Sequence, residues 1–561
     1  MKYKVLCITS VVIAILFCAM ISPLKAQVLP AMTYGSTNSE RAFAIVEATY
    51  GNGYVLAGWT KSIGLGTPNF SNVLVVRVDS TGIPMGAKVS IGTNDDEAYS
   101  MVRTFDGGYA MTGWTKSYGL LAPDSSNIFL IKLDSLGNQQ WGWVYGSPFN
   151  EKAYSIIQTQ DKGYAVTGWT NLTTVAPTGK PNIFLFRVDS LGAPMWAGIY
   201  WFPFINLQEE GYSVYEIPGV GVTKRYLIAG RAKVYYSNNY DAFIIQTNPV
   251  GAPLLATIAT GVGEDEAHSV IWDGTGIVTA GWSNSFGPSD DIIVWKTDTL
   301  GNSFWGRCYG WPVNEERVMD DQSLIRTYMD NGYAVAGWTK SVGPGTPTNP
   351  NFLIMKLDTN GLPMWARVHP SAPGALTEKA YPMIITQIVP RGYAIAGYTN
   401  SFGSGADDFH LLTLDPQGNR PVCVIDTSPL LVDFPIAVEG FTGEPNMFVQ
   451  MEPMTLIDTI VNYTEICSII PGVKEWVGEI TTNDFMLYAL FENITVKLNV
   501  SGLLSLNLYD VMGRNVSTLT HGQFTKGTHL FNLPKNLSAG VYFVQADFEG
   551  IKKSTKVVRY Q

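Results

Sequence analysis

Gly108-Tyr109-Ala110-Met111-Thr112-Gly113-Trp114-Thr115 is the stretch that decides the fold, because the chain repeats it with small changes. Each copy opens with Gly-Tyr or a variant and closes with Gly-Trp-Thr or a variant. The Trp position recurs every 51 to 62 residues, a period close to that of β-propeller blades. The residues at this position are Trp59, Trp114, Trp169, Arg231, Trp282, Trp338 and Tyr398.

Four strand-like runs lie within one copy. In the second copy they are residues 98–104, 109–115, 127–133 and 140–145, each rich in β-branched or aromatic side chains. Turns containing Asp and Gly follow the first and third runs, as in tight hairpins. Seven copies of four strands predict an all-β, seven-bladed β-propeller with four-stranded blades over residues 27–421. In this interpretation the repeated tryptophans are structural residues of the blade.

The two ends of the repeat region predict how the propeller closes. Residues 28–35 look like a fourth strand, whereas the seventh copy keeps three strands up to Leu414 and lacks a good fourth. We therefore expect the N-terminal strand to complete the last blade, which removes two exposed sheet edges.

Residues 1–26 are predicted to be a secretory signal peptide. Lys2 and Lys4 precede an apolar run to Ile21, and Leu24-Lys25-Ala26 precedes the expected cleavage site. No later stretch is long and apolar enough to span a membrane. The net charge is -10 and no basic run is visible, which argues against nucleic acid as a partner.

The cysteines divide between the leader and the mature chain. Cys7 and Cys18 lie in the predicted leader. Cys423 and Cys467 are candidates for a disulfide in an oxidising compartment, and Cys308 reads as a buried, small apolar residue. Three cysteines in the mature chain leave the pairing open.

A glutamate is expected just before the first strand of every copy. Two interpretations are open: a ring of carboxylates that binds a cation, or structural positions that accept hydrogen bonds where the chain crosses between blades. We favour the structural role, because a calcium site needs six or more convergent oxygens. The set is Glu40, Glu97, Glu151, Glu210, Glu266, Glu316 and Glu378.

The loops between second and third strands differ between copies while the strands do not. Such loops on a rigid scaffold are typical of recognition surfaces, although solvated loops with no ligand are the alternative. We expect these loops and the blade crossings to open on one face. The candidate ligand-binding residues are Tyr118, Tyr235, Tyr236, Phe286 and Phe402.

The sequence carries no motif that points to catalysis. His268, His369 and His410 lie in different copies, and none has a partner at metal-ligand spacing. No nucleophile elbow, phosphate loop or dinucleotide-binding glycine pattern is present. We therefore expect no catalytic residue, no metal and no cofactor, and favour a binding protein over an enzyme.

The period stops after the seventh copy. Residues 422–482 read as a connector with some strands, and short alternating strands over residues 483–561 predict a small Ig-like antiparallel β-sandwich. Three motifs mark this last region: Leu508 to Arg514 (LYDVMGR), Leu537 to Val544 (LSAGVYFV) and Lys556 to Arg559 (KVVR).

These motifs, in this order, resemble the type A C-terminal sorting domain of the type IX secretion system found in Bacteroidetes-like bacteria. The Pro-Asn-Pro that commonly opens that domain is missing here, which leaves the start of the domain open. The resemblance implies a partner in the outer-membrane secretion machinery, followed by release or cell-surface attachment. The residues that carry the resemblance are Asp510, Gly513, Arg514, Gly540, Tyr542 and Lys556.

The sequence thus predicts an exported binding, adhesion or scaffold protein whose propeller loops recognise an extracellular glycan, protein or surface. Two alternatives remain. One is a secreted propeller enzyme, such as a hydrolase, a lyase or a quinone-dependent oxidoreductase, and the other is a self-associating surface-layer component. Fold analogy alone does not separate them.

Overall fold

The computed structural model is all-β over the residues that it describes, with no helix among them. It falls into two compact units, Met1–Pro471 and Gly472–Gln561. The described residues run from 31 to 559, with gaps at 50–52, 120, 173–178, 203–207, 220–223, 234–238, 260, 287–288, 312–313, 328–329, 344–346, 370–377, 387–391, 402, 404–405, 420–424, 428–429, 434–436, 440–441, 446–451, 454–455, 460–461, 466–484, 491–492, 499, 511–513, 535–536 and 539. The predicted signal peptide lies outside these residues.

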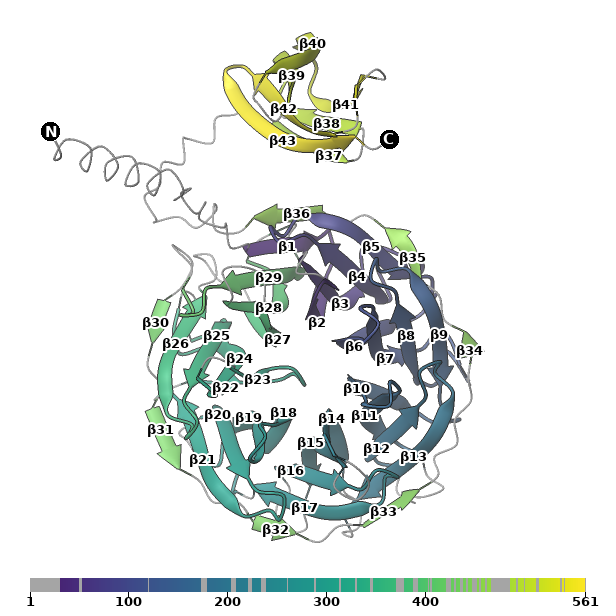
Figure 1. Ribbon diagram of the computed structural model, residues 1–561, viewed down its shortest axis with the longest axis vertical. Coiled ribbons are helices and arrows are strands. Elements are labelled where there is room, and N and C mark those ends of the chain that lie inside the picture. The colour runs from purple at the N-terminus through teal and green to yellow at the C-terminus, as the bar shows by residue number, and fades with distance from the viewer. Residues whose placement is uncertain are drawn as a thin grey trace, which may run out of the picture. The chain divides into compact units, whose positions relative to one another are not determined.

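Seven antiparallel sheets make up the first unit (Figure 1). We number them sheets 1 to 7, and each keeps the four runs expected of one repeat. Sheet 1 contains β2 (Glu40–Glu47), β3 (Tyr54–Thr60), β4 (Asn72–Val78) and β5 (Pro84–Ser90). Sheet 2 contains β6 (Asp96–Arg103), β7 (Tyr109–Thr115), β8 (Asn127–Leu133) and β9 (Gln139–Tyr145). Sheet 3 contains β10 (Glu151–Gln158), β11 (Tyr164–Thr170), β12 (Asn182–Val188) and β13 (Pro194–Trp201).

The remaining four sheets repeat this order. Sheet 4 contains β14 (Glu209–Ile217), β15 (Arg225–Lys233), β16 (Tyr240–Thr247) and β17 (Pro253–Ala259). Sheet 5 contains β18 (Asp265–Trp272), β19 (Ile277–Ser283), β20 (Asp291–Thr297) and β21 (Ser303–Gly310). Sheet 6 contains β22 (Glu316–Arg317), β23 (Leu324–Arg326), β24 (Tyr333–Thr339), β25 (Asn351–Leu357) and β26 (Pro363–His369). Sheet 7 contains β27 (Glu378–Thr386), β28 (Gly392–Thr399), β29 (Asp408–Leu414) and β1 (Ala31–Gly35).

The N-terminal strand β1 lies where the sequence predicts it. It pairs antiparallel with β29, the third strand of the seventh copy, with Met32 opposite Leu411. The hydroxyl of Tyr34 on β1 donates a 2.7 Å hydrogen bond to the carbonyl of Gly82 in sheet 1. The same type of bond joins neighbouring sheets elsewhere: Tyr145 to Gly192, Tyr200 to Gly251, and Tyr309 to Gly361. Sheets 7 and 1 are therefore neighbours in the same sense as consecutive sheets.

The repeated motif forms the second strand of each sheet, and its burial explains its composition. All seven residues of β7 are buried, because neighbouring sheets cover both faces of the strand. At Gly113 a Cβ atom would lie 1.9 Å from the carbonyl oxygen of Glu97, so the inner strand leaves no room for a side chain. Gly58, Gly168 and Gly281 stand in the same situation.

Each sheet has one further strand, at its outer edge, that the repeat did not predict. The connector returns past the repeat region in reverse order and adds one short strand to the outer edge of every sheet (Figure 1). We call this segment the belt. Its strands are β30 (Ile425–Thr427) on sheet 6, β31 (Leu430–Asp433) on sheet 5, β32 (Ala437–Glu439) on sheet 4, β33 (Thr442–Pro445) on sheet 3, β34 (Glu452–Pro453) on sheet 2, β35 (Leu456–Thr459) on sheet 1 and β36 (Asn462–Glu465) on sheet 7.

The second unit contains two small antiparallel sheets that share one hydrophobic core. Ile494 and Val496 of one sheet pack in the same cluster as Leu506 and Val544 of the other. The order of strands is β37-β38-β41 in the first sheet and β40-β39-β42-β43 in the second. Their bounds are β37 (Phe485–Leu490), β38 (Asn493–Leu498), β39 (Gly502–Asp510), β40 (Asn515–Phe524), β41 (Gly527–Asn532), β42 (Gly540–Phe548) and β43 (Ile551–Arg559).

Candidate functional site

The innermost strands of the seven sheets place matching side chains in tiers around the axis of the first unit. The tier nearest the crossings between sheets consists of the second residue of each inner strand. In the strand register this residue pairs with the motif Trp or its replacement. We call it the charge ring, because every member is ionisable. In order of sheets its members are Arg41, Glu97, Lys152, Glu210, Glu266, Arg317 and Lys379.

The charge ring explains what the motif tryptophans do. Where its member is basic, the cation lies over an aromatic ring of the preceding sheet, a favourable cation–π arrangement. Lys152 Nζ lies 3.6 Å from the Trp114 ring centroid, and the Arg317 guanidinium carbon lies 3.9 Å from that of Trp282. Trp59, Trp114, Trp282 and Trp338 are buried, and Trp169 is partly buried.

A tier of aromatic residues lies two positions further along the inner strands. Tyr212 and His268 stack with centroids 4.5 Å apart, and Phe43 contacts Tyr99 and Tyr381 at 4.9 Å each. Tyr154 bridges Tyr99 and Tyr212 at 5.2 and 5.5 Å. We call this set the aromatic tier. Its members are Phe43, Tyr99, Tyr154, Tyr212, His268, Met319 and Tyr381.

Sheet 6 interrupts its inner strand with a segment that reaches across the axis. Between β22 and β23, Asp321 accepts a 2.7 Å hydrogen bond from Ser100 of sheet 2, and Gln322 donates one of 2.7 Å to the carbonyl of Met101. The backbone carbonyl of Asp321 accepts another from Ser269 of sheet 5. This segment, residues 320–323, crosses the axis below the aromatic tier. We call it the plug, and we call the depression above it the mouth.

Buried carboxylates occupy the first position of the inner strands, and hydrogen bonds hold them. Glu40 accepts a hydrogen bond from the motif hydroxyl of Thr60 at 2.8 Å and from the backbone N–H of Ser36 at 2.8 Å. Glu151 and Glu316 accept the equivalent bonds from Thr170 and Thr339 at 3.0 and 2.8 Å. Each of these carboxylates therefore bonds the threonine at the end of the neighbouring strand of its own sheet.

Strand register divides the seven predicted glutamates into two sets. Glu378, like Glu40 and Glu151, pairs with the Thr that ends the motif. Glu97, by contrast, pairs with Trp114 and belongs to the charge ring, as do Glu210 and Glu266. In those three sheets the first position is instead taken by Asp96, Glu209 and Asp265.

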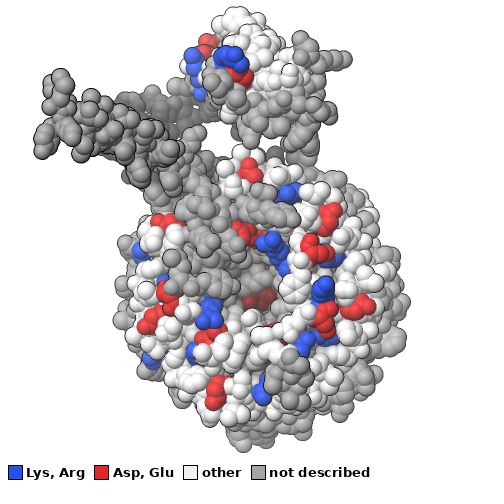
Figure 2. Space-filling view, viewed as in Figure 1, with Lys and Arg blue, Asp and Glu red and all other residues white. Residues whose placement is uncertain are grey.

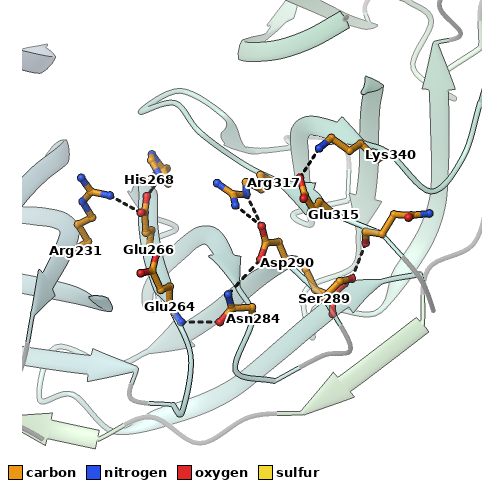
Figure 3. Close-up of polar contacts among 12 residues, drawn as sticks. Arg231, Glu264, Glu266, His268, Asn284, Ser289, Asp290, Glu315, Arg317 and Lys340 are labelled. Carbon is orange, nitrogen blue, oxygen red and sulfur yellow. Dashed lines mark hydrogen bonds and ion pairs between the residues drawn. The ribbon is translucent and has the colours of Figure 1, made fainter. Parts of the chain in front are cut away.

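An ion-pair cluster lies on one side of the mouth, where Arg231 replaces the motif Trp (Figure 3). Arg231 bridges Glu210 at 2.9 Å and Glu266 at 2.7 Å, and His268 Nε2 lies 2.8 Å from the second oxygen of Glu266. Burial opposes ionisation of Glu266, but His268 and Arg231 outweigh it and lower its pKa to about 2. Glu266 is therefore a fixed anion between two partners.

A basic cavity of about 510 Å³ opens on the other side of the mouth, between sheets 6, 7 and 1. Consecutive basic members of the charge ring line it, together with residues of the loops that follow the motif in sheets 6 and 7. Figure 2 shows basic and acidic side chains close together around the hollow centre of the ring. The cavity is lined by Arg41, Glu315, Arg317, Met319, Trp338, Lys340, Thr348, Pro350, Lys379, Tyr398, Asn400 and Asp407.

The variable loops and the crossings between sheets lie on the same face as the charge ring. The N–H of Lys61, which opens the first loop, donates to the carbonyl of Ser39 at a crossing, and that of Asp96 donates to Ser71 at the end of the same loop. Two of the predicted loop aromatics are described, and both are partly buried. Tyr118 packs on the core between sheets 1 and 2, and Phe286 packs on that between sheets 4 and 5. Tyr235, Tyr236 and Phe402 lie outside the described residues.

The histidines and cysteines occupy several environments. Cys308 is a free, buried cysteine that packs in an apolar cluster, and burial raises the pKa of its thiol. Cys423 and Cys467 lie outside the described residues, so their pairing stays a prediction. His369 and His410 come from different repeats yet lie with ring centroids 5.2 Å apart, which sequence spacing did not reveal. Among the described residues, no group of three or more His, Cys, Asp or Glu is arranged to hold a metal ion.

The predicted sorting residues lie along the second sheet of the C-terminal unit. Arg514 Nε donates a 2.7 Å hydrogen bond to Asp510 and thereby closes the turn after β39. Tyr542 pairs with Asp510 across the sheet, and its hydroxyl donates to the carbonyl of Ser538 at 3.0 Å. Gly540 and Lys556 lie in paired strands β42 and β43, and Gly513 is outside the described residues.

The fold and the mouth together define an all-β repeat protein with a separate C-terminal β module. Residues 491–559 of that module match the family described as the secretion system C-terminal sorting domain. Such a domain directs export by type IX secretion, so the protein is carried across the outer membrane to the cell surface or the medium. Against curated proteins the sequence gives no significant match. No helix within the described part of the chain is long and apolar enough to cross a membrane.

Proposed function

We propose that the first unit is a closed seven-bladed β-propeller and that the second is an Ig-like sandwich. The repeated Tyr–Gly contact between sheets supports the closed propeller, because it joins sheet 7 to sheet 1 as it joins consecutive sheets. The aromatic tier supports it too, since Phe43 of sheet 1 contacts both Tyr99 of sheet 2 and Tyr381 of sheet 7. We further propose that residues 1–26 are removed as a signal peptide.

We propose that the exported protein binds an extracellular ligand in the mouth. The observation that carries this proposal is the arrangement of side chains at the mouth: a charge ring above an aromatic tier, with the plug below. Tyr99, Tyr154 and Tyr212 are only partly buried, so their rings offer contact area beside fixed charges. Concave sites with aromatic walls and a few placed polar groups are typical of ligand recognition. The sorting domain supplies the route by which the binding unit reaches its ligand.

A binding screen with the mature chain, residues 27–561, tests this proposal. The chain is applied to a glycan array and used to pull down extracellular proteins. Replacing Tyr99 and Tyr154 by Ala removes two adjacent members of the aromatic tier, and we expect affinity for the selected ligand to fall by about tenfold or more. Phe105→Ala is the matched control. Phe105 is 67% exposed and lies in the hairpin turn that follows β6, the strand that carries Tyr99. Equal losses in both variants would count against the mouth.

A secreted enzyme is the second candidate, and one specific observation favours it. The cluster of Glu210, Arg231, Glu266 and His268 is an asymmetric set of charged groups beside the mouth, and no other sheet has an Arg at the motif position. Its members are engaged with one another, as expected of a structural ion-pair network. Turnover of a bound ligand that His268→Ala abolishes, with binding retained, would favour the enzyme.

A further inference from the structure

We propose that the basic cavity between sheets 6, 7 and 1 binds the anionic group of an acidic saccharide, a uronate carboxylate or a sulfate ester, with Lys379 as its principal cation. This inference rests on the proposed function and names the chemistry of its ligand. It concerns one sector of the mouth, opposite the cluster around Arg231.

The four cations that line the cavity differ in whether a carboxylate pairs with them. Arg41 is held by Asp407 at 2.6 Å, and Lys340 by Glu315 at 2.7 Å. Arg317 is held by Asp290, with its Nε 2.8 Å from the carboxylate. Lys379 makes no ion pair or hydrogen bond with any residue that the structure describes; its nearest specific contact is the Trp338 ring, with the centroid 4.9 Å from Nζ. Three of the four cations are therefore paired with a carboxylate, and Lys379 is the fourth.

The position of Lys379 disfavours the charged form of its side chain. Burial and the nearby charges of Arg41, Lys340 and Arg317 lower the pKa of its ammonium group. An anion in the cavity relieves that repulsion and accepts hydrogen bonds from the ammonium. Carboxylate and sulfate oxygens suit this environment, because charge-assisted hydrogen bonds to an ammonium or guanidinium are among the stronger ones in proteins.

The cavity lining also contains neutral residues that suit a sugar. Thr348 and Asn400 bring a hydroxyl and an amide from two different loops, and Pro350 adds an apolar surface. Sugar hydroxyls require such neutral hydrogen-bonding groups, and the C–H faces of a sugar ring pack on apolar surfaces. A saccharide uses both kinds of wall as well as the cations. A volume of about 510 Å³ is within the range of small-molecule sites.

Isothermal titration calorimetry with the mature chain tests the inference. The probes are tetragalacturonate, a sulfated disaccharide and neutral maltotetraose. We expect at least one acidic probe to bind, its affinity to fall with added salt, and the neutral probe to bind at least about tenfold more weakly. Binding by one acidic probe alone identifies whether the anion is a carboxylate or a sulfate.

Two substitutions separate the charge of Lys379 from its packing. We expect K379M to lower affinity for the acidic probe by about tenfold and K379R to retain it to within about threefold. K180M is the control, because Lys180 is an exposed lysine away from the cavity, in the loop between β11 and β12 of sheet 3. Thermal melting of each variant checks that it is folded. If K379M misfolds, the salt dependence and the neutral probe still decide.

The outcomes distinguish this inference from the proposed function. A neutral saccharide bound as tightly as the acidic ones, or an acidic probe bound equally by K379M, overturns the inference. In either case the Tyr99 and Tyr154 variant still reports whether the mouth binds a ligand. If no saccharide binds, the inference fails and the protein pull-down alone decides the proposed function.

Discussion

At the scale of single residues, Gly113 shows why the repeated motif keeps its composition. The carbonyl of Glu97 stands where its side chain would lie, so only glycine allows the inner strand to pair at this point. The repeat of Gly-Tyr and Gly-Trp-Thr therefore predicted the strands well. The sequence did not reveal the close approach itself, because that depends on a bulge in the partner strand between Ala98 and Ser100.

Replacing Gly113 by Ala tests this explanation. We expect G113A to lower the free energy of unfolding by about 2 kcal/mol, because the added methyl group forces two strands apart. Gly86 is the matched control, since a Cβ atom there meets nothing within 4 Å. Chemical denaturation of both variants measures the difference. Equal stability of G113A and G86A would contradict the role assigned to the motif glycine.

The buried carboxylates of the inner strands predict an unusual dependence of stability on pH. Burial raises the pKa of these groups: Asp96 to about 6, Glu151, Asp265 and Glu316 to about 7, and Glu209 to about 8. In the unfolded chain they titrate near pH 4. Between those values the folded state holds protons that the unfolded state has lost, so stability rises as pH falls from about 8 to about 5.

Other carboxylates set the lower limit of that window. Burial opposes ionisation of Asp161, but hydrogen bonds from Thr159 and Arg187 lower its pKa to about 2, so its contribution is lost as pH falls below about 4. We expect the melting temperature to peak near pH 5 and E209Q to flatten the slope above it, with E549Q, an exposed control, unchanged. A melting temperature that rises steadily from pH 5 to 8 would contradict this assignment.

The candidate site could be predicted only in part from the sequence. The loops lie beside the crossings between sheets, and Lys340 and Pro350 of one loop line the basic cavity. Only Glu97, Glu210 and Glu266 of the charge ring were among the predicted residues. Aligning the copies on glutamate merged the first and second positions of the inner strands. A recurring Ala-Tyr-Ser, as in residues 98–100 and 153–155, was the signal for the aromatic tier. The sequence does not show that those rings meet, because they come from separate repeats.

At the scale of elements, the belt and the plug were not predicted. The plug has a sequence signal: residues 320–322 insert three positions between Met319 and Ser323, which take the places of Tyr154 and Ser155 in the third copy. The belt has almost none, because its strands are two to four residues long and lack a repeated pattern. Each belt strand forms only because an outer sheet edge offers unpaired backbone groups.

Proline substitution in the belt tests whether its backbone pairing stabilises the sheets. Val432 of β31 pairs with Cys308 of β21, and V432P removes its N–H. We expect amides of β21 to exchange faster with deuterium in V432P than in V432A, the control that keeps the N–H group. Hydrogen-exchange mass spectrometry measures both. Unchanged exchange in β21 would show that the belt contributes no protection there.

The two cysteines of the predicted disulfide flank the belt in the sequence. β30 begins at Ile425 and β36 ends at Glu465, so Cys423 and Cys467 stand two residues outside either end of the belt. A bond between them would tie the two ends of the belt together. Intact mass with and without reduction, on protein recovered from the medium, reports whether the bond forms.

At the scale of the whole molecule, export and the proposed ligand binding belong to different units. The C-terminal unit matches a sorting domain and accounts for export, whereas the first unit carries the mouth. The sorting motifs were predictable because local strands and turns contain them, as the Asp510–Arg514 contact illustrates. The chemistry of the proposed ligand was not predictable from the sequence. It depends on Arg41, Arg317 and Lys379, which are far apart in the chain and line one cavity only in the folded protein.

The central claim is that this exported protein binds its ligand in the mouth, and a crystal structure of the mature chain grown with tetragalacturonate tests it most directly. We predict density for the saccharide within the basic cavity, with a carboxylate against Lys379 and the sugar near Thr348 and Asn400. Density at the hairpin turns between first and second strands, on the belt or on the sorting domain, with the mouth empty, would contradict the claim.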